Sequence, residues 1–218
     1  MTNSVTDRCR LVLIAPKEAS GEEFAPRLEA ALGAGDVASV IFPAYAMDDA
    51  AYQRHLERCV PIAQASGAAA IAVNDTRAFG RSGADGLHVD SGAQDIADAI
   101  EKSKGQSIIG AGGAETRHRA LELGELRPDY VFFGRFGMDT RPEPHKRNLA
   151  LAEWWASMVE IPCIVLGGGS LETLGQAATT GAEFVALSGA VFGEGTDPAA
   201  AVAEANRILD SYQFTEDA

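Results

Sequence analysis

The segment IPCIVLGGGSLETLGQAATTGAEFVALSGAVFGEGTDP, residues 161–198, contains two short apolar runs that each end in a glycine-rich turn. The run at 163–167 leads into GGGS, and the run at 183–188 leads into SGA. A helical segment at 170–181, with Ser170 as a candidate N-cap, separates them. This order is typical of buried parallel strands alternating with helices, so the segment predicts two consecutive β-strand–α-helix units.

The same unit recurs along the whole chain, which predicts a single (β/α)8 barrel domain over residues 1–218. An open doubly wound sheet is the alternative, but its G-x-G-x-x-G fingerprint does not follow the first apolar run. Pro61 predicts a kink or break in one helix. Strands are expected at 11–15, 37–42, 69–73, 85–89, 107–111, 129–134, 163–167 and 183–188. Helical segments are expected at 21–35, 48–67, 93–105, 114–124, 149–160, 170–181 and 197–212, with a short helix or turn near 76–82.

Composition excludes several classes of function. The formal net charge of −13 argues against a nucleic-acid partner, because phosphate backbones need basic surface. No apolar run approaches the length of about 18 residues that a membrane span requires, and no signal pattern opens the chain. Cys9, Cys59 and Cys163 form no C-x-x-C pair and are expected as buried small residues. We therefore expect a cytoplasmic protein without a membrane partner, and leave association into a homo-oligomer open.

In a (β/α)8 barrel the functional groups lie at the carboxyl ends of the strands, and the loops after strands 7 and 8 frequently bind phosphate. The two glycine turns occupy those positions. Backbone N–H groups of Gly167, Gly168, Ser188 and Gly189 are the candidate phosphate donors. The alternative is that both are merely tight turns in a barrel built with small residues.

Polar residues also end strands 3 and 4. Asn74 and Asp75 could hold a substrate ring or a Mg²⁺ ion, or they could form an Asx turn or helix N-cap. Strand alternation puts His88 and Asp90 on one face, so His88 is expected to point into the barrel mouth. The alternative for His88 is a core histidine with satisfied hydrogen bonds.

The loop GRFGMDTRPEPHKR, residues 134–147, carries a local excess of positive charge in an acidic protein. This reversal predicts a lid that binds an anion, and the alternative is a solvated connection. The residues concerned are Arg135, Arg141, His145, Lys146 and Arg147.

Four stretches together resemble the thiamine phosphate synthase superfamily, which includes thiazole tautomerases, over nearly the whole chain. They are VNDTRAFGRSGADGLHVD (73–90), RPDYVFFGRFGMDTRP (127–142), IPCIVLGGGS (161–170) and TGAEFVALSGAVFGEGTDP (180–198). The resemblance implies a (β/α)8 barrel that couples a pyrimidine diphosphate to a thiazole phosphate, with Mg²⁺ and with loss of pyrophosphate. The chemistry it implies is dissociative, through a pyrimidine cation, so positioning and electrostatics carry it.

The resemblance also implies roles for individual residues. Asp75 matches a magnesium ligand, His88 matches the histidine of strand 4, and Arg141 takes the place of a lysine near the pyrophosphate. We predict Arg141 and His88 as catalytic residues. The predicted substrate- and phosphate-binding residues are Asn74, Arg135, Thr140, Gly167, Gly168, Ser188 and Gly189.

The sequence departs from the family pattern where the diphosphate is expected. SVIFPAY (39–45) replaces a Gln-x-Arg-x-Lys motif, and a metal-binding aspartate aligns near Ala93. A serine is replaced within GAGGAE (110–115), where the catalytic histidine of a tautomerase is also missing. A divergent thiazole-phosphate tautomerase or isomerase, or a non-catalytic phosphate-binding barrel, therefore remain alternatives to the synthase.

Overall fold

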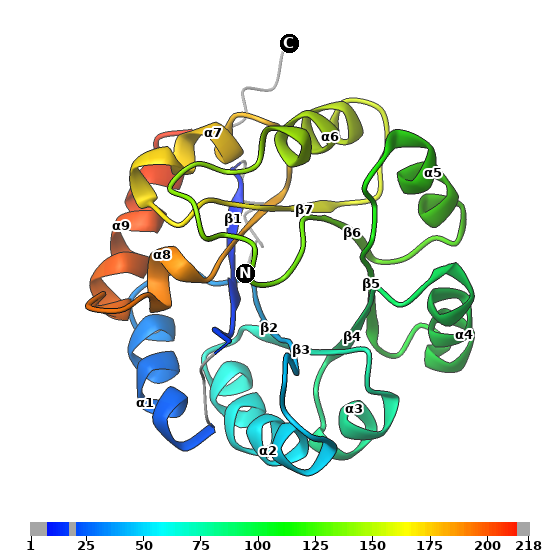
Figure 1. Ribbon diagram of the computed structural model, residues 1–218, viewed down its shortest axis with the longest axis horizontal. Helices are drawn as coiled ribbons and strands as arrows, with labels where there is room; N and C mark the ends of the chain where they lie inside the picture. Colours follow the sequence, from blue (N-terminus) through cyan, green and yellow to red (C-terminus); the bar gives the residue numbers. More distant parts are fainter. Residues whose placement is uncertain (1–7, 18–20, 213–218) are drawn as a thin grey trace, which may run out of the picture.

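The computed structural model describes residues 8–17 and 21–212, and it shows a closed barrel of parallel strands (Figure 1). Each strand pairs with the next along the chain, and β8 closes the barrel by pairing with β1, with Arg10 opposite Phe184. The predicted (β/α)8 fold is confirmed. The strands are β1 (Arg10–Ile14), β2 (Ser39–Phe42), β3 (Ala69–Val73), β4 (Gly86–Val89), β5 (Ile108–Ala111), β6 (Tyr130–Phe133), β7 (Cys163–Leu166) and β8 (Phe184–Leu187).

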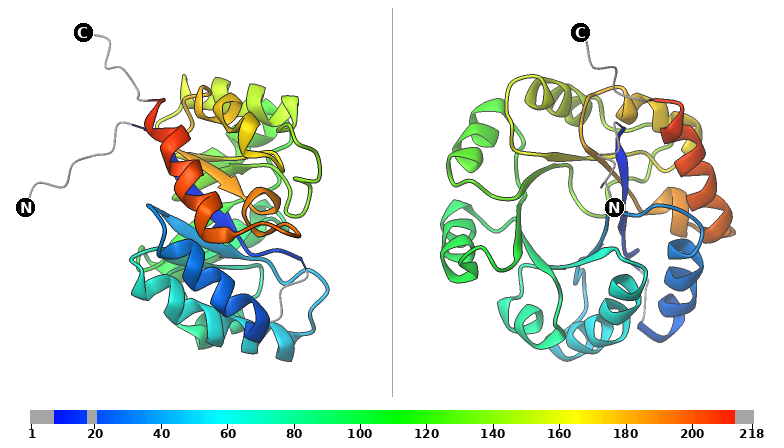
Figure 2. Two further views of the ribbon diagram at one scale, coloured as in Figure 1. Left: turned by 90° about the vertical axis from the view of Figure 1, so that its left-hand side faces the viewer. Right: turned by 180° about the vertical axis from the view of Figure 1, so that it is seen from behind.

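The helices surround the barrel on its outside, as the right-hand view in Figure 2 shows. They cover the outer face of the strands, so each strand is buried on both sides. The helices are α1 (Gly21–Leu32), α2 (Asp49–Ala65), α3 (Thr76–Ser82), α4 (Ala93–Ser103), α5 (Arg117–Glu125), α6 (Lys146–Ala156), α7 (Leu174–Ala178), α8 (Gly189–Phe192) and α9 (Pro198–Asp210), with a 3-10 turn η1 (Leu171–Thr173).

Several helices differ from expectation. The helix α2 continues through Pro61 without a break. The segment 170–181 divides into η1 and the short α7, and α8 was not predicted. The helix α6 begins at Lys146, three residues earlier than expected, because the Nδ1 atom of His145 accepts a hydrogen bond from the Arg147 N–H at 3.2 Å. His145 therefore caps a helix, and Arg147 lies within it rather than in the loop.

Two hydrophobic layers meet at the barrel wall. One lies between strands and helices, and includes the buried side chains of Cys9, Cys59 and Cys163. The other fills the barrel interior with large side chains, as alternation along barrel strands predicts. Its members are Val12, Ile14, Ile41, Ile71, Val73, Tyr130, Phe132, Ile164, Leu166 and Ala186.

Two glycines of the IIGAGG stretch make room for rings inside the barrel. A Cβ atom on Gly110 would overlap the ring of Tyr130, and one on Gly112 would lie 2.6 Å from the Nε2 atom of His88. Both are closer than real Cβ contacts allow. These two glycines thus fix where the rings of Tyr130 and His88 can lie.

We expect Gly110→Ala to lower the free energy of unfolding by about 1–3 kcal/mol, the usual cost of overpacking a core. Chemical denaturation measures this change. Gly80→Ala in α3 is the matched control, since a Cβ there meets nothing within 4 Å. It should raise stability by up to about 1 kcal/mol through helix propensity. Equal effects of the two substitutions would contradict the packing described for Gly110.

The helices of the described residues are all too short or too polar to cross a lipid bilayer.

Candidate functional site

A cavity of about 360 Å³ opens at the carboxyl ends of β2, β3, β4 and β6. Polar groups enter it from three of these strand ends, which is where barrel enzymes place their active sites. Its wall combines one positive, one negative and several aromatic or apolar side chains. The residues that line it are Pro43, Ala44, Tyr45, Val73, Asn74, Asp90, Arg135 and Phe136.

Asn74 and Asp90 form a reciprocal pair at this cavity. The Asn74 side-chain amide donates to Asp90 Oδ1 at 2.7 Å, and the Asp90 backbone N–H donates to Asn74 Oδ1 at 3.0 Å. Asn74 has a φ of 58°, in the left-handed region that asparagine tolerates better than most residues. The pair therefore fixes both side chains at the mouth, with polar atoms left to meet a ligand.

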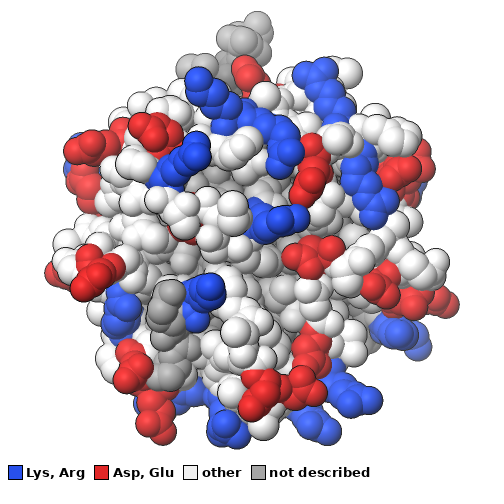
Figure 3. Space-filling model, viewed as in Figure 1, with Lys and Arg blue, Asp and Glu red and all other residues white. Residues whose placement is uncertain are grey.

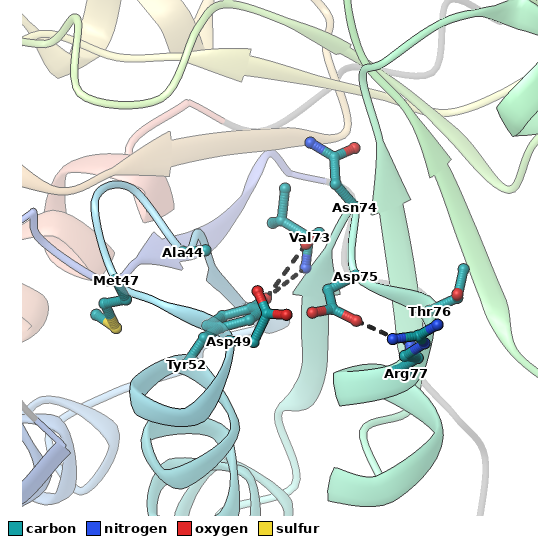
Figure 4. Close-up of a pocket in the computed structure, with 9 residues that line it drawn as sticks. All are labelled: Ala44, Met47, Asp49, Tyr52, Val73, Asn74, Asp75, Thr76 and Arg77. Atoms are coloured by element: carbon teal, nitrogen blue, oxygen red, sulfur yellow. Dashed lines mark hydrogen bonds between the residues drawn. The ribbon is translucent and has the colours of Figure 1, made fainter.

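Asp75 faces a neighbouring space, away from Asn74 (Figure 4). This second pocket, of about 450 Å³, is also lined by Asp49, Tyr52 and Arg77. Asp75 caps α3, because its Oδ1 accepts the N–H groups of Arg77 and of Ala78 at 2.9 Å. The structure is thus compatible with both a helix cap and a Mg²⁺ ligand at Asp75. The Oδ1 atom is used by the cap, and the structure records no hydrogen bond to Oδ2.

A Mg²⁺ ion is usually held by one or two carboxylates together with substrate phosphates and water. The described residues contain no group of three or more His, Cys, Asp or Glu side chains arranged to hold a metal. The pocket with Asp75 and Asp49 therefore fits an ion that arrives with a phosphorylated substrate, and not one held by a protein cage.

His88 lies one layer below the mouth, inside the barrel. It is fully buried, its Nδ1 lies 3.0 Å from the Tyr130 hydroxyl, and its Nε2 has no hydrogen-bond partner. The ring packs edge-on against Phe132 and Phe136, at 5.6 and 5.1 Å between centroids. Burial lowers the pKa of His88 to about 4, against a smaller opposing effect of the Asp90 charge. The expectation that His88 points into the mouth is corrected: it points inward, and Phe136 separates it from the cavity.

The glycine turns after β7 and β8 lie next to each other. The Gly167 N–H donates to the Ala186 carbonyl at 2.9 Å as part of the barrel ladder, so in this structure it is not a free donor. Gly168 and Ser188 are buried at the turns, and no bond to the Gly168 N–H is recorded. The Gly189 N–H donates to the Asp139 carboxylate at 2.5 Å.

The segment from β6 to α6 crosses toward α7 and α8 (Figure 1). Thr140 and Arg141 are exposed on it, and the structure records no ion pair for Arg141. Arg135 is 74% exposed and lies 3.3 Å from Glu115, a distance and exposure at which an ion pair contributes little. Lysine and arginine side chains gather in the upper half of the face in Figure 3, where Figure 1 places this segment and α6. The local excess of positive charge is therefore present in the folded protein.

The predicted residues fall into separate groups. Asn74 and Arg135 share the mouth cavity, and Asn74 also lines the adjoining pocket that Asp75 faces. The turns and the loop residues over them form another group, and His88 lies beneath the mouth. The sequence did not single out Asp139 or Tyr130. Gly110 of β5 could have pointed to Tyr130, since a small residue on one strand leaves room for a large side chain on the next.

Fold and site together define a (β/α)8 protein with its polar groups and its paired glycine turns at the carboxyl ends of the strands. The chain belongs to the thiamine monophosphate synthase family, whose model matches residues 11–191.

Two relatives match over nearly their whole length. The chain is 37% identical to the thiamine-phosphate synthase of Rhodospirillum centenum over 202 residues, which cover 92% of this chain and 98% of the relative. It is 33% identical to the thiamine-phosphate synthase of Hyphomonas neptunium over 210 residues, covering 94% and 95%.

Solved structures share the fold at lower identity. The thiamine phosphate pyrophosphorylase of Pyrococcus furiosus matches with a TM-score of 0.78 and 19% identity, covering 94% of this chain and 98% of that one. A 3-hexulose-6-phosphate synthase matches with a TM-score of 0.69 and 20% identity, covering 91% and 99%. These likenesses support the barrel fold.

Proposed function

We propose that this protein is a thiamine-phosphate synthase, which joins a pyrimidine diphosphate to a thiazole phosphate and releases pyrophosphate. The observation that carries the proposal is the 37% identity to the Rhodospirillum centenum synthase over 92% of the chain. The residues at the strand ends support it, because they supply polar side chains at the mouth and glycine turns beside it.

The thiazole phosphate would bind at the turns after β7 and β8. Gly168 and Gly189 let the backbone approach a phosphate closely, and Ser188 adds a hydroxyl beside them. Thr140 and Arg141 lie on the segment that covers these turns, so they would close over the bound anion. Binding there would use backbone donors, which hold a fixed direction and carry no side-chain entropy cost.

The pyrimidine would bind in the mouth cavity against the Asn74–Asp90 pair, whose donors and acceptors are held in place. Its diphosphate would extend toward Arg135 and the free oxygen of Asp75. Fixing both substrates converts a bimolecular reaction into one within a single complex. The negative groups around the mouth would stabilise positive charge that develops on the pyrimidine as pyrophosphate leaves.

Magnesium fits this proposal as an ion shared between protein and substrate. Asp75 would hold it through Oδ2, since Oδ1 caps α3. The ion would supply neutralisation of the diphosphate charge as it becomes a leaving group.

One observation favours a second function. Among the described residues that line the mouth cavity, Arg135 is the only lysine or arginine, and it already faces Glu115. A diphosphate carries several negative charges, and charge-assisted hydrogen bonds to it contribute strongly to binding. A barrel that binds only the thiazole phosphate, as an isomerase, a tautomerase or a sensor, would need fewer cations at the mouth.

Two measurements separate these functions. A synthase forms thiamine phosphate in steady state when both substrates and Mg²⁺ are saturating. Calorimetry with each substrate alone then tests the second function: binding of the thiazole phosphate without binding of the pyrimidine diphosphate, and without turnover, would replace the synthase by a thiazole-phosphate-binding relative.

A further inference from the structure

Residues 135–145, which we call the β6 strap, lie on both glycine turns. The carbonyls of Arg141 and Pro142 accept hydrogen bonds from the N–H groups of Gly169 at 2.7 Å and Ser170 at 3.3 Å. Two N–H groups of the β7 turn, those of Gly169 and Ser170, are therefore bonded to the strap.

Thr173 and Gly168 also hold the strap against the turn after β7. The Thr173 hydroxyl donates to the Pro142 carbonyl at 2.7 Å, and a Cβ on Gly168 would overlap that carbonyl. Only glycine at 168 lets the strap lie this close, so the contact is built into the sequence of the turn.

A side chain fastens the strap to the β8 turn. Asp139 Oδ2 accepts the Gly189 N–H at 2.5 Å, and a Cβ on Gly189 would lie 3.2 Å from that oxygen. The contact joins residues 50 apart in sequence, and Asp139 is only partly exposed. A hydrogen bond from a backbone amide to an ionised carboxylate is short and about twice as strong as a neutral one.

We propose that Asp139 sets the affinity for the phosphorylated thiazole, because its carboxylate holds the Gly189 amide in the free protein and must leave before a phosphate binds. The inference rests on the proposed function, in which this turn receives the phosphate. A carboxylate and a phosphate both present anionic oxygens to an N–H donor, so they compete for Gly189. Binding of the phosphate is then weaker than it would otherwise be, because the hydrogen bond between Asp139 and Gly189 is lost when the phosphate binds.

The same strap covers the buried histidine. Phe136, near its start, packs 5.1 Å from His88 and stacks on Phe132 at the same centroid distance. Release of the strap at Asp139 would let Phe136 move relative to the ring of His88, whose Nε2 has no hydrogen-bond partner. Phosphate binding and access to the barrel interior would thus depend on one segment.

Asp139→Asn tests the proposal with a residue of the same size. Asparagine still offers an oxygen to Gly189 but no negative charge, so the internal competitor is weaker and repels the incoming phosphate less. Glu143→Gln is the matched control, since it removes one charge from the exposed part of the same strap, and no hydrogen bond of that side chain is recorded.

Calorimetry with the thiazole phosphate, and with inorganic phosphate as a second probe, measures the effect. We expect Asp139→Asn to bind the thiazole phosphate about tenfold more tightly, which corresponds to about 1.4 kcal/mol, and Glu143→Gln to bind like the parent protein within about twofold. In steady state, KM for the thiazole phosphate should fall while KM for the pyrimidine diphosphate stays unchanged. A change in folding alone would not move one KM and spare the other.

Amide hydrogen exchange of Gly189 gives a readout that needs no ligand. The exchange should be faster in Asp139→Asn than in the parent protein and unchanged in Glu143→Gln. Equal exchange in all three proteins, or equal affinity of the parent and Asp139→Asn, overturns the proposal for Asp139. If exchange differs but neither protein binds the thiazole phosphate, the proposed function fails, and the role of Asp139 in affinity fails with it.

Discussion

Asp75→Asn is expected to lower turnover about 100-fold while the protein stays folded. Asparagine caps helices about as well as aspartate, so the bonds to the N–H groups of Arg77 and Ala78 survive. What disappears is the negative charge that would hold Mg²⁺ against the diphosphate, and the loss of one electrostatic group at a reacting centre typically costs two to three orders of magnitude. Steady-state rates with both substrates saturating measure the effect.

Asp197→Asn is the matched control for this prediction. Asp197 caps α9 in the same way, through the N–H groups of Ala199 and Ala200, and it lines neither the mouth cavity nor the pocket of Asp75. Thermal unfolding should change little in either variant. If Asp75→Asn retains full turnover, Asp75 is a helix cap and no more, and the alternative stated from the sequence is correct.

The free energy of unfolding is expected to fall steeply as the pH drops from about 6.5 toward 4. Burial lowers the pKa of both His55 and His88 to about 4, whereas an unfolded histidine titrates near its ordinary value of about 6.5. Between these values the unfolded chain binds protons that the folded chain does not, so stability rises with pH and is lost on acidification. Two such groups give a slope of about 3 kcal/mol per pH unit within this window.

His55 offers the cleaner test of that slope. Its ring is 2% exposed, lies 5.9 Å from Phe24 and 5.8 Å from Phe42, and makes no hydrogen bond. His55→Leu should therefore keep the stability at neutral pH and reduce the slope by about half. Denaturation curves at a series of pH values measure both quantities.

The control for His55 is the exposed His118. His118→Gln should change the slope little, because this side chain is 87% exposed and its contact with Glu122, at 3.2 Å, is a surface ion pair of a kind that contributes little to stability. A slope in His55→Leu equal to that of the parent protein would show that buried histidine does not cause the acid sensitivity.

The fold follows from the sequence because its signals are local and repeated. Each strand is a short apolar run bounded by small-residue turns. The range 69–73 was predicted to the residue, and α3 lies where a short helix or turn was expected near 76–82. The barrel then fixes which loops meet, so the sequence alone predicts that the two glycine turns lie side by side. The cap at His145 was missed because a histidine is not a usual N-cap residue.

The site was predicted less fully because its contacts join distant segments. Gly167 loses its donor to the ladder between β7 and β8, which depends on strand register. The depth of His88 depends on Tyr130, 42 residues away, and on Phe136 above it. The bond from Asp139 to Gly189 depends on the path of a loop, for which the sequence carries no periodic signal.

That the turns after β7 and β8 hold the substrate's phosphate is tested most directly by titrating the isotope-labelled protein with the thiazole phosphate and following backbone amide signals by NMR. We predict that the largest shifts fall on Gly168, Gly169 and Gly189, with smaller shifts at Thr140 and Arg141. Saturable binding whose largest shifts fall elsewhere, with these glycine amides unmoved, would contradict the placement of the phosphate.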